Sequence, residues 1–498
     1  MTVGRIVVKL FHTPVDFSNP NSAEVFRAMQ QLQSQAAPLQ LPQFPSGALV
    51  SPPPVRTAST PLSWPPGNVG GLALLMYHLS IRPVAEVSIA TALAIVAGIC
   101  GLGWNSHTGA GLNLYIAFVG RSGIGKEAIA DGISKLMTAS FLKGAIHAPS
   151  FFTFDSLASG QALVKQMAET PCLLHISGEF GHDIAYMAID KTGPHATLRQ
   201  QMTKLYSKSS AGAVAGGISY SNRESNVQIG GSVSYSMIGE TTPGTFYEAL
   251  NGSMMSDGFM SRFVVIEYEG QRPPENDLRG SVSKEWTDWF ERLVNAATAQ
   301  TVAVPAIPDE DAKLLYSKFN LECDMQVNST QDEARRQMWN RAHLKALKVG
   351  SLLAVADNHI SPVISGVHAQ WSIELVQRDI GGMTRRLTSG DIGGGDDARR
   401  QKVQKCVREW LTEELPETYR KRSGWPEMKR ASLVPRNYLT NRLQSLPLFS
   451  NHRLGANAAI SSVLDGMVRD GLLRPIEKGR VRDMFGFHGE GYAVLWLD

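Results

Sequence analysis

The strongest chemical signal in the sequence is the glycine-rich segment GRSGIGK at residues 120–126. Two glycines flank four residues and a lysine follows, which is the spacing of a loop that binds phosphate groups. The glycines allow a tight curl that points backbone N–H groups at phosphate oxygens, and the lysine adds a positive charge. A glycine-rich turn without a ligand is the alternative. The residues predicted to contact phosphates are Gly120, Arg121, Ser122, Gly123, Ile124, Gly125, Lys126 and Glu127.

Two residues in and near this loop depart from the usual pattern. Glu127 stands where such loops carry the Ser or Thr that ligates Mg²⁺. After the apolar run 172–177, Gly178 replaces the expected metal-binding Asp, and Glu179 remains to activate a water molecule. Because the departures coincide, we expect Glu127 to be a metal ligand, since a carboxylate is also a hard oxygen donor. Alternatively, Glu127 points into solvent, and waters and phosphates hold the ion.

Two threonines and two arginines could act on the same phosphates. Thr241 and Thr242 follow the apolar run 233–239 and could sense a γ-phosphate, although Thr-Thr-Pro is also an ordinary turn. Arg262 could neutralise charge on the nucleotide of a neighbouring subunit, and Arg341 could contact a phosphate within its own chain. A surface ion pair explains Arg262 equally well, and a solvated basic face explains Arg341.

A stretch rich in Ser and Gly lies between these motifs. Its segments 213–220 and 226–233 could pair as a hairpin around a Ser-Asn-Arg-Glu turn. Lys204, Lys208 and Arg223 would then be placed to bind the phosphates of DNA. A surface hairpin without a ligand is the alternative.

The elements that must position these residues indicate an α/β core. Four short apolar runs bounded by Gly, Ser or Pro are typical of buried parallel strands. They occupy 113–119, 172–177, 233–239 and 262–269, with helices predicted at 126–137 and 156–167. Residues 84–104 are interrupted by polar side chains, which favours a buried core helix over a membrane span. Helical spacing between 309 and 387 predicts a helical lid.

Composition and charge divide the chain into four parts. We predict an N-terminal lead with a Pro-rich linker at 1–68, an α/β core at 69–304, a helical lid at 305–390 and a basic domain at 399–498. The basic domain has 18 Lys and Arg against 11 Asp and Glu, whereas the rest of the chain has 30 against 34. The overall net charge of +3 hides this split, which favours nucleic acid as a partner.

The basic domain has the element order of a winged helix. Helices are predicted at 402–415, 436–446 and 456–470, followed by a hairpin across 473–497. The third helix would take the position that contacts DNA. Because winged helices also bind proteins, the alternative is that this domain binds a protein partner.

Other classes of protein are disfavoured by the sequence. The four cysteines lie far apart, so neither a zinc site nor a small disulfide scaffold is expected. The N-terminus lacks the long apolar region of a secretory signal. We therefore expect a soluble, cytoplasmic protein without a membrane partner.

Taken in order, the motifs resemble the P-loop helicase-like proteins of phages and plasmids, a primase-associated group of unknown function related to AAA+ and RecA-like ring helicases. The resemblance covers roughly residues 70–385, and its first motif is specific for nucleotide binding. The segments that carry it are GLNLYIAFVGRSGIGKEAI, LLHISGEFG, SMIGETTPGTFYEAL, DGFMSRF and RAHLKALKVGSLLAVAD.

The resemblance implies a P-loop NTPase core that hydrolyses ATP with Mg²⁺ at the subunit interfaces of a ring, usually a hexamer. Its activity would be the unwinding of single-stranded or forked DNA during replication in a bacterial host, together with other replication proteins. On that implication Lys126 binds phosphate, Glu179 activates water and Arg262 acts in trans. The competing functions are a loader or remodeller of other proteins and a replication initiator that binds DNA without unwinding it.

Overall fold

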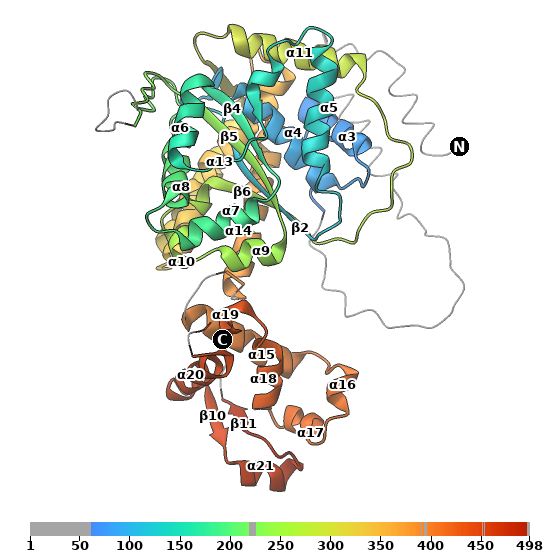
Figure 1. Ribbon diagram of the computed structural model, residues 1–498, viewed down its shortest axis with the longest axis vertical. Helices are drawn as coiled ribbons and strands as arrows, with labels where there is room; N and C mark the ends of the chain where they lie inside the picture. The colour runs from blue at the N-terminus through green and yellow to red at the C-terminus, as the bar shows by residue number, and fades with distance from the viewer. Residues whose placement is uncertain are drawn as a thin grey trace.

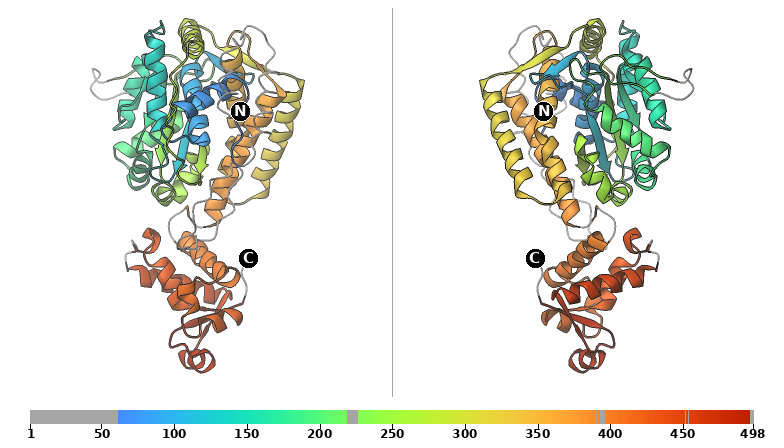
Figure 2. Two further views of the ribbon diagram at one scale, coloured as in Figure 1. Left: turned by 90° about the vertical axis from the view of Figure 1, so that its right-hand side faces the viewer. Right: turned by 90° about the vertical axis from the view of Figure 1, so that its left-hand side faces the viewer.

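The computed structural model describes residues 61–218, 226–389, 391–392, 396–450, 452 and 454–495. Figure 1 shows an α/β body followed by a smaller C-terminal part, and Figure 2 shows them from two further sides. Most of the predicted N-terminal lead (residues 1–60), which includes a predicted Pro-rich linker, and also Arg223 lie outside the described residues.

The body is built around a sheet of five parallel strands in the order β3-β4-β5-β2-β6. Their bounds are β3 (Phe152–Thr153), β4 (Cys172–Ser177), β5 (Ser234–Thr241), β2 (Tyr115–Gly120) and β6 (Phe263–Tyr268). The four apolar runs of the sequence are thus confirmed as parallel strands, and every residue of β2 is buried. Because the strands are parallel, their carboxyl ends meet at one edge of the sheet, called here the carboxyl edge. The opposite edge is the amino edge.

Helices cover both faces of the sheet (Figure 1). One hydrophobic core joins the sheet to α3 (Gly67–Leu79), α4 (Ala85–Cys100), α5 (Ala128–Phe141) and α11 (Lys284–Ala299). The other includes α6 (Gly160–Glu169), α7 (Phe180–Ile189), α8 (Pro194–Leu205), α9 (Pro243–Ala249) and α10 (Gly252–Ser256). Helix α4 is buried along almost its whole length, which confirms the expected core helix.

Three long helices follow the sheet, in the region where helical spacing predicts them. They are α12 (Glu310–Ser329), α13 (Glu333–Asp357) and α14 (Gly366–Thr388). A second parallel sheet lies beside them, in the order β1 (Trp104–Ser106), β7 (Val304–Pro308) and β8 (Val363–Ile364). Residues of α13 and α14 contribute to both hydrophobic cores, so these helices form part of the body.

A buried ion pair fixes α13 and α14 against β6. Lys345 Nζ lies 2.5 Å from Asp379 Oδ2, and only 2% and 3% of the two side chains are exposed. Lys345 also donates to the carbonyl oxygen of Phe263, and Asp379 accepts from the N–H of Val265. Since burying a charge is costly without such partners, this arrangement satisfies both groups at the strand they hold.

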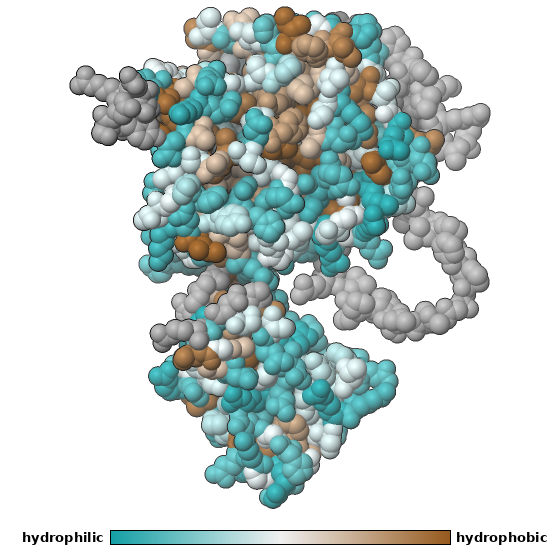
Figure 3. All heavy atoms as spheres, in the orientation of Figure 1, coloured by the Kyte–Doolittle hydropathy of each residue, from teal (hydrophilic) through white to brown (hydrophobic). Residues whose placement is uncertain are grey.

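The C-terminal part has a hydrophobic core of its own. Its helices are α15 (Asp396–Thr412), α16 (Glu417–Arg420), α17 (Trp425–Arg430), α18 (Arg436–Leu443), α19 (Pro447–Ser450), α20 (Ala456–Arg469) and α21 (Lys478–Phe485). An antiparallel sheet has the order β10 (Leu473–Ile476), β11 (Gly491–Val494), β9 (Leu433–Pro435). The predicted hairpin is therefore present, with α21 between its two strands. Figure 3 shows a mostly hydrophilic surface on one face of this part.

Among the described residues, no helix has both the length and the apolar character needed to cross a membrane.

Candidate functional site

The glycine-rich segment forms the connection between β2 and α5, at the carboxyl edge of the sheet. Gly123 and Gly125 have φ angles of +76° and +104°, which side chains rarely tolerate. At Gly125 a Cβ atom would lie only 2.5 Å from the carbonyl oxygen of Arg82. The curl expected from the sequence is therefore present, and glycine is required at its tightest point.

The backbone of this loop offers unused hydrogen-bond donors. In the described part of the chain, the N–H groups of residues 122–126 donate to no other protein group. Lys126 Nζ donates to the carbonyl oxygens of Gly120 and Thr241, each at 3.2 Å, and so joins the ends of β2 and β5. Unpaired N–H groups, a helix N-terminus and an ammonium at one place form an environment suited to a phosphate.

Glu240 is a site residue that the sequence analysis did not assign. The pairing of Ser177 with Gly239 places the next two residues, Gly178 and Glu240, side by side at the carboxyl edge. A Cβ atom on Gly178 would meet only Glu240 Oε1, at 3.7 Å. The other carboxylate oxygen, Oε2, is buried and has no hydrogen-bond partner in the described structure. Glu240 thus reaches the space that an Asp at 178 would have faced.

The electrostatics of the loop connect Lys126 to three carboxylates. Burial lowers the pKa of Lys126, while Glu240, Glu179 and Glu127 oppose this shift. Burial raises the pKa of Glu240 to about 7, which Lys126 counteracts and the other two carboxylates reinforce. The three carboxylates and Lys126 therefore act on one another at the carboxyl edge.

Glu127 and Glu179 are more exposed than Glu240. Glu127 precedes α5 and is exposed. Glu179 precedes α7, has 85% of its side chain exposed, and lies 3.7 Å from His182 Nε2. Among the described residues, no group of three or more His, Cys, Asp or Glu side chains is arranged to hold a metal ion. An ion at this edge would therefore depend on oxygens brought by its ligand.

The two threonines after β5 have different surroundings. Thr241 contacts Lys126 through its backbone carbonyl, while its hydroxyl donates to the Thr242 carbonyl at 3.4 Å. The Thr242 hydroxyl oxygen accepts from the N–H of Thr245 and caps α9. Thr242 therefore has the structural role of an N-cap, whereas Thr241 lies at the loop.

Arg262 and Arg341 belong to a basic cluster at the amino edge, defined here as Arg262, Arg341 and Lys348 around the ring of Tyr206. Lys348 Nζ lies 4.1 Å from the centre of that ring, and Arg262 Cζ lies 6.0 Å from it. Lys348 also donates to Asn113 Oδ1 at 2.6 Å. The Nε atoms of both arginines are buried without a hydrogen-bond partner in the described structure.

The length of the sheet separates this basic cluster from Lys126. Tyr115 pairs with Phe263, the residue after Arg262, whereas Lys126 is bonded to the far end of β2 at Gly120. Five residues of strand span about 16 Å. The structure therefore does not bring Arg262 or Arg341 to the loop of the same chain.

The predicted hairpin also projects from the amino edge. Ile218 and Val227 exchange two backbone hydrogen bonds of 2.9 and 3.0 Å, which confirms the antiparallel pairing. Lys204 is exposed near the end of α8, and Lys208 is half-buried. The Lys208 carbonyl accepts from Val233, directly before β5. Both lysines lie near the base of the hairpin.

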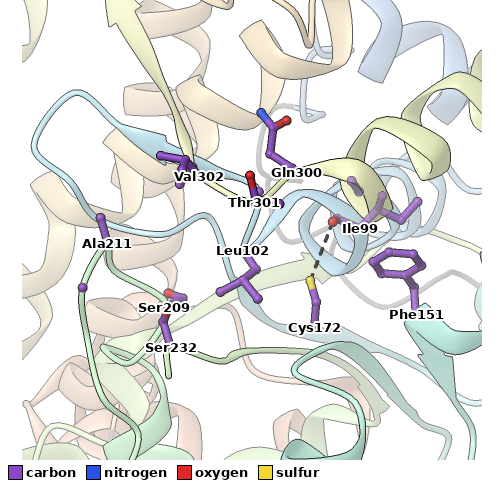
Figure 4. A pocket seen from close by; sticks show the side chains of 14 residues that line it. Ile99, Leu102, Phe151, Cys172, Ser209, Ala211, Ser232, Gln300, Thr301 and Val302 are labelled. Atoms are coloured by element: carbon purple, nitrogen blue, oxygen red, sulfur yellow. Dashed lines mark hydrogen bonds between the residues drawn. The ribbon is translucent and has the colours of Figure 1, made fainter. Parts of the chain in front are cut away.

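A cavity of about 340 Å³ lies beside the hairpin and contains none of the predicted site residues (Figure 4). Ile99, Phe151 and Ser209 line it, together with Cys172, whose thiol donates to the Gly98 carbonyl at 3.1 Å. Burial raises the pKa of the Cys172 thiol to about 12, so a nucleophilic thiolate is disfavoured. This cavity is therefore separate from the glycine-rich loop and from the basic cluster.

In comparisons with known proteins, no family model matches the chain, and no curated protein matches it either.

We expect Lys348→Met to remove part of the pH dependence of stability. Burial, reinforced by Arg341 and Arg262, lowers the pKa of Lys348 to about 7 from an ordinary value of 10.5. Between these values the unfolded chain binds the extra proton, so the free energy of unfolding rises with pH. Between about pH 7.5 and about pH 9, urea unfolding of the wild type should show an additional rise on the order of 1 kcal/mol.

The matched control is Lys135→Met, which removes a half-buried lysine paired with Asp131 at 2.6 Å. This variant should keep the pH dependence of the wild type. An equal rise in the wild type and in Lys348→Met would contradict the assignment of that dependence to Lys348.

Proposed function

We propose that this chain is an ATP-dependent DNA helicase or translocase that hydrolyses ATP between the subunits of a ring. The observation that carries the proposal is the loop at 120–127, with unpaired N–H groups and a lysine that bridges two strand ends. Its place at the carboxyl edge of a parallel sheet is where ligands of such sheets bind. The resemblance found in the sequence supports ATP as the ligand.

In this proposal, different residues of the site bind ATP and hydrolyse it. The N–H groups of residues 122–126 would hold phosphate oxygens, and Lys126 would exchange its carbonyl partners for the β- and γ-phosphates. Glu179, exposed before α7, is free to orient and deprotonate the attacking water. When bound, Mg²⁺ would neutralise charge on the phosphate oxygens. Buried Thr241 would sense the γ-phosphate beside Lys126.

The basic cluster supports sites shared between subunits. Its two arginines are half-buried, so part of each side chain is accessible to an anion from a neighbouring subunit. Because the sheet keeps them about 16 Å from the loop of their own chain, the anion is assigned to the nucleotide of a neighbour. We therefore extend the trans role of Arg262 to Arg341.

DNA contacts are assigned to the hairpin and to the C-terminal part. Lys204 and Lys208, near the base of the hairpin, would bind backbone phosphates. The C-terminal helices and antiparallel sheet are compatible with a winged helix, with α20 as the helix that approaches DNA.

One observation favours the competing function of a loader or initiator. Several cations of the C-terminal part are already paired: Arg436 with Glu490 at 2.8 Å, and Arg400 with Asp470. Helix α20 itself contains a single basic residue, Arg469. A surface with this balance also suits a protein partner.

The proposal predicts that Lys126→Ala abolishes ATP hydrolysis and strand displacement on forked duplexes. Loss of the ammonium removes both a phosphate contact and the bridge between β2 and β5. ATP turnover should fall by at least about 100-fold, while Lys135→Ala, which removes a lysine within α5 that pairs with Asp131, should keep the wild-type rate. ATPase activity without unwinding in the wild type would favour the loader. Undiminished turnover in Lys126→Ala would refute the proposal.

The shared site predicts rescue by mixing two inactive variants. Arg262→Ala lacks the arginine, and Lys126→Ala lacks the loop lysine, so neither should hydrolyse ATP alone. In mixed rings, some interfaces join an intact loop to an intact Arg262, and part of the activity should return. Turnover should be measured across mixing ratios. If no ratio restores hydrolysis, Arg262 does not act in trans.

A further inference from the structure

The carboxyl edge contains a glycine where a carboxylate is expected and a carboxylate on the adjacent strand. Gly178 directly follows β4, and Glu240 lies beside it within β5. A Cβ on Gly178 would meet no described atom other than Glu240 Oε1, at 3.7 Å. The two positions therefore face the same space from neighbouring strands.

We propose that Glu240 supplies the carboxylate oxygen that faces the metal ion of a bound metal–nucleotide complex, in place of the Asp absent at 178. The inference rests on the proposed function, since it deepens the account of the same site. Glu240 in β5 thereby takes the role of metal ligand that the sequence predicted for Glu127.

The geometry favours Glu240 over the two other carboxylates. Its Oε2 atom is buried and has no hydrogen-bond partner in the described structure. Buried polar atoms usually have a partner, so this oxygen is available to a ligand. The next residue, Thr241, accepts from Lys126 at 3.2 Å, which places Glu240 directly beside the phosphate-binding lysine. Glu127 is exposed, and so is most of Glu179. A buried oxygen beside the phosphates is the better fit to a hard cation.

A single protein carboxylate is sufficient for this role. Mg²⁺ in nucleotide sites keeps several waters and is held by one or two carboxylates together with phosphate oxygens. The absence of a preformed three-residue metal site among the described residues is therefore compatible with the proposal. Glu240 would hold the complex only when the nucleotide brings the remaining oxygens.

The test measures metal affinity directly, with Mn²⁺ as the probe. The full chain is saturated with a non-hydrolysable ATP analogue, and Mn²⁺ binding is followed by electron paramagnetic resonance. Glu240→Gln keeps the shape and removes the charge, and should weaken Mn²⁺ binding by at least about tenfold. Analogue binding in EDTA should be unchanged or tighter, because a negative charge near the phosphates is gone. Glu127→Gln and Glu179→Gln are matched controls and should retain Mn²⁺ affinity.

A double variant that moves the carboxylate from position 240 to position 178 tests whether the effect of Glu240→Gln is indirect. Gly178 has no positive φ, and a Cβ atom added there would meet only Glu240 Oε1, at 3.7 Å, so the backbone accepts a side chain at this position. The double variant Gly178→Asp with Glu240→Gln should recover Mn²⁺ affinity to within about threefold of the wild type. Recovery would show that the position of the charge matters, whichever strand carries it.

The outcomes separate this inference from the proposed function. Wild-type Mn²⁺ affinity in Glu240→Gln, with analogue binding lost in Lys126→Ala, would overturn the role of Glu240 and leave the nucleotide site standing. Normal Mn²⁺ affinity with lost hydrolysis would also overturn it, since Glu240 would then act on water. If the wild type binds no analogue with or without Mn²⁺, both proposals fail.

Discussion

The bridge from the Lys126 ammonium to the carbonyl oxygens of Gly120 and Thr241 is the interaction on which the site depends. It ties the glycine-rich loop to the neighbouring strand β5 as well as to its own strand β2. That contact requires β5 to lie next to β2 and to end level with it, which the parallel sheet provides. The α4 helix and the buried pair of Lys345 and Asp379 hold this sheet from two sides.

The sheet also sets the distance between two unlike surfaces. At its carboxyl edge, three carboxylates act electrostatically on one lysine, and the loop N–H groups lack acceptors. At its amino edge lie the basic cluster and the hairpin with Lys204 and Lys208. Under the proposed function, a phosphate bound at one edge would meet the cations of the other edge only across a contact between subunits, because the two edges are separated by a strand length. The ring in the proposal would provide this contact repeatedly.

Local sequence was sufficient for the loop, the parallel strands, the core helix and the base of the hairpin, because each depends on neighbouring residues. It was insufficient for Glu240, whose position beside Gly178 follows from the register between β4 and β5. From its place in a predicted lid helix, Arg341 could have contacted a phosphate within its own chain or lain on a solvated basic face, whereas α13 carries it to the basic cluster at the amino edge. The Thr-Thr-Pro pattern did not decide whether Thr242 is a sensor or part of a turn. The hydrogen bond from the N–H of Thr245 shows that Thr242 is an N-cap.

The central claim is that the unpaired N–H groups of residues 122–126 are the donors for the phosphates of ATP. Amide hydrogen exchange across this loop, measured with and without a non-hydrolysable ATP analogue, tests it most directly. The account predicts that exchange slows at these amides when the analogue binds, and that Lys126→Ala abolishes the slowing. Unchanged exchange in the loop at a saturating concentration of the analogue would contradict it.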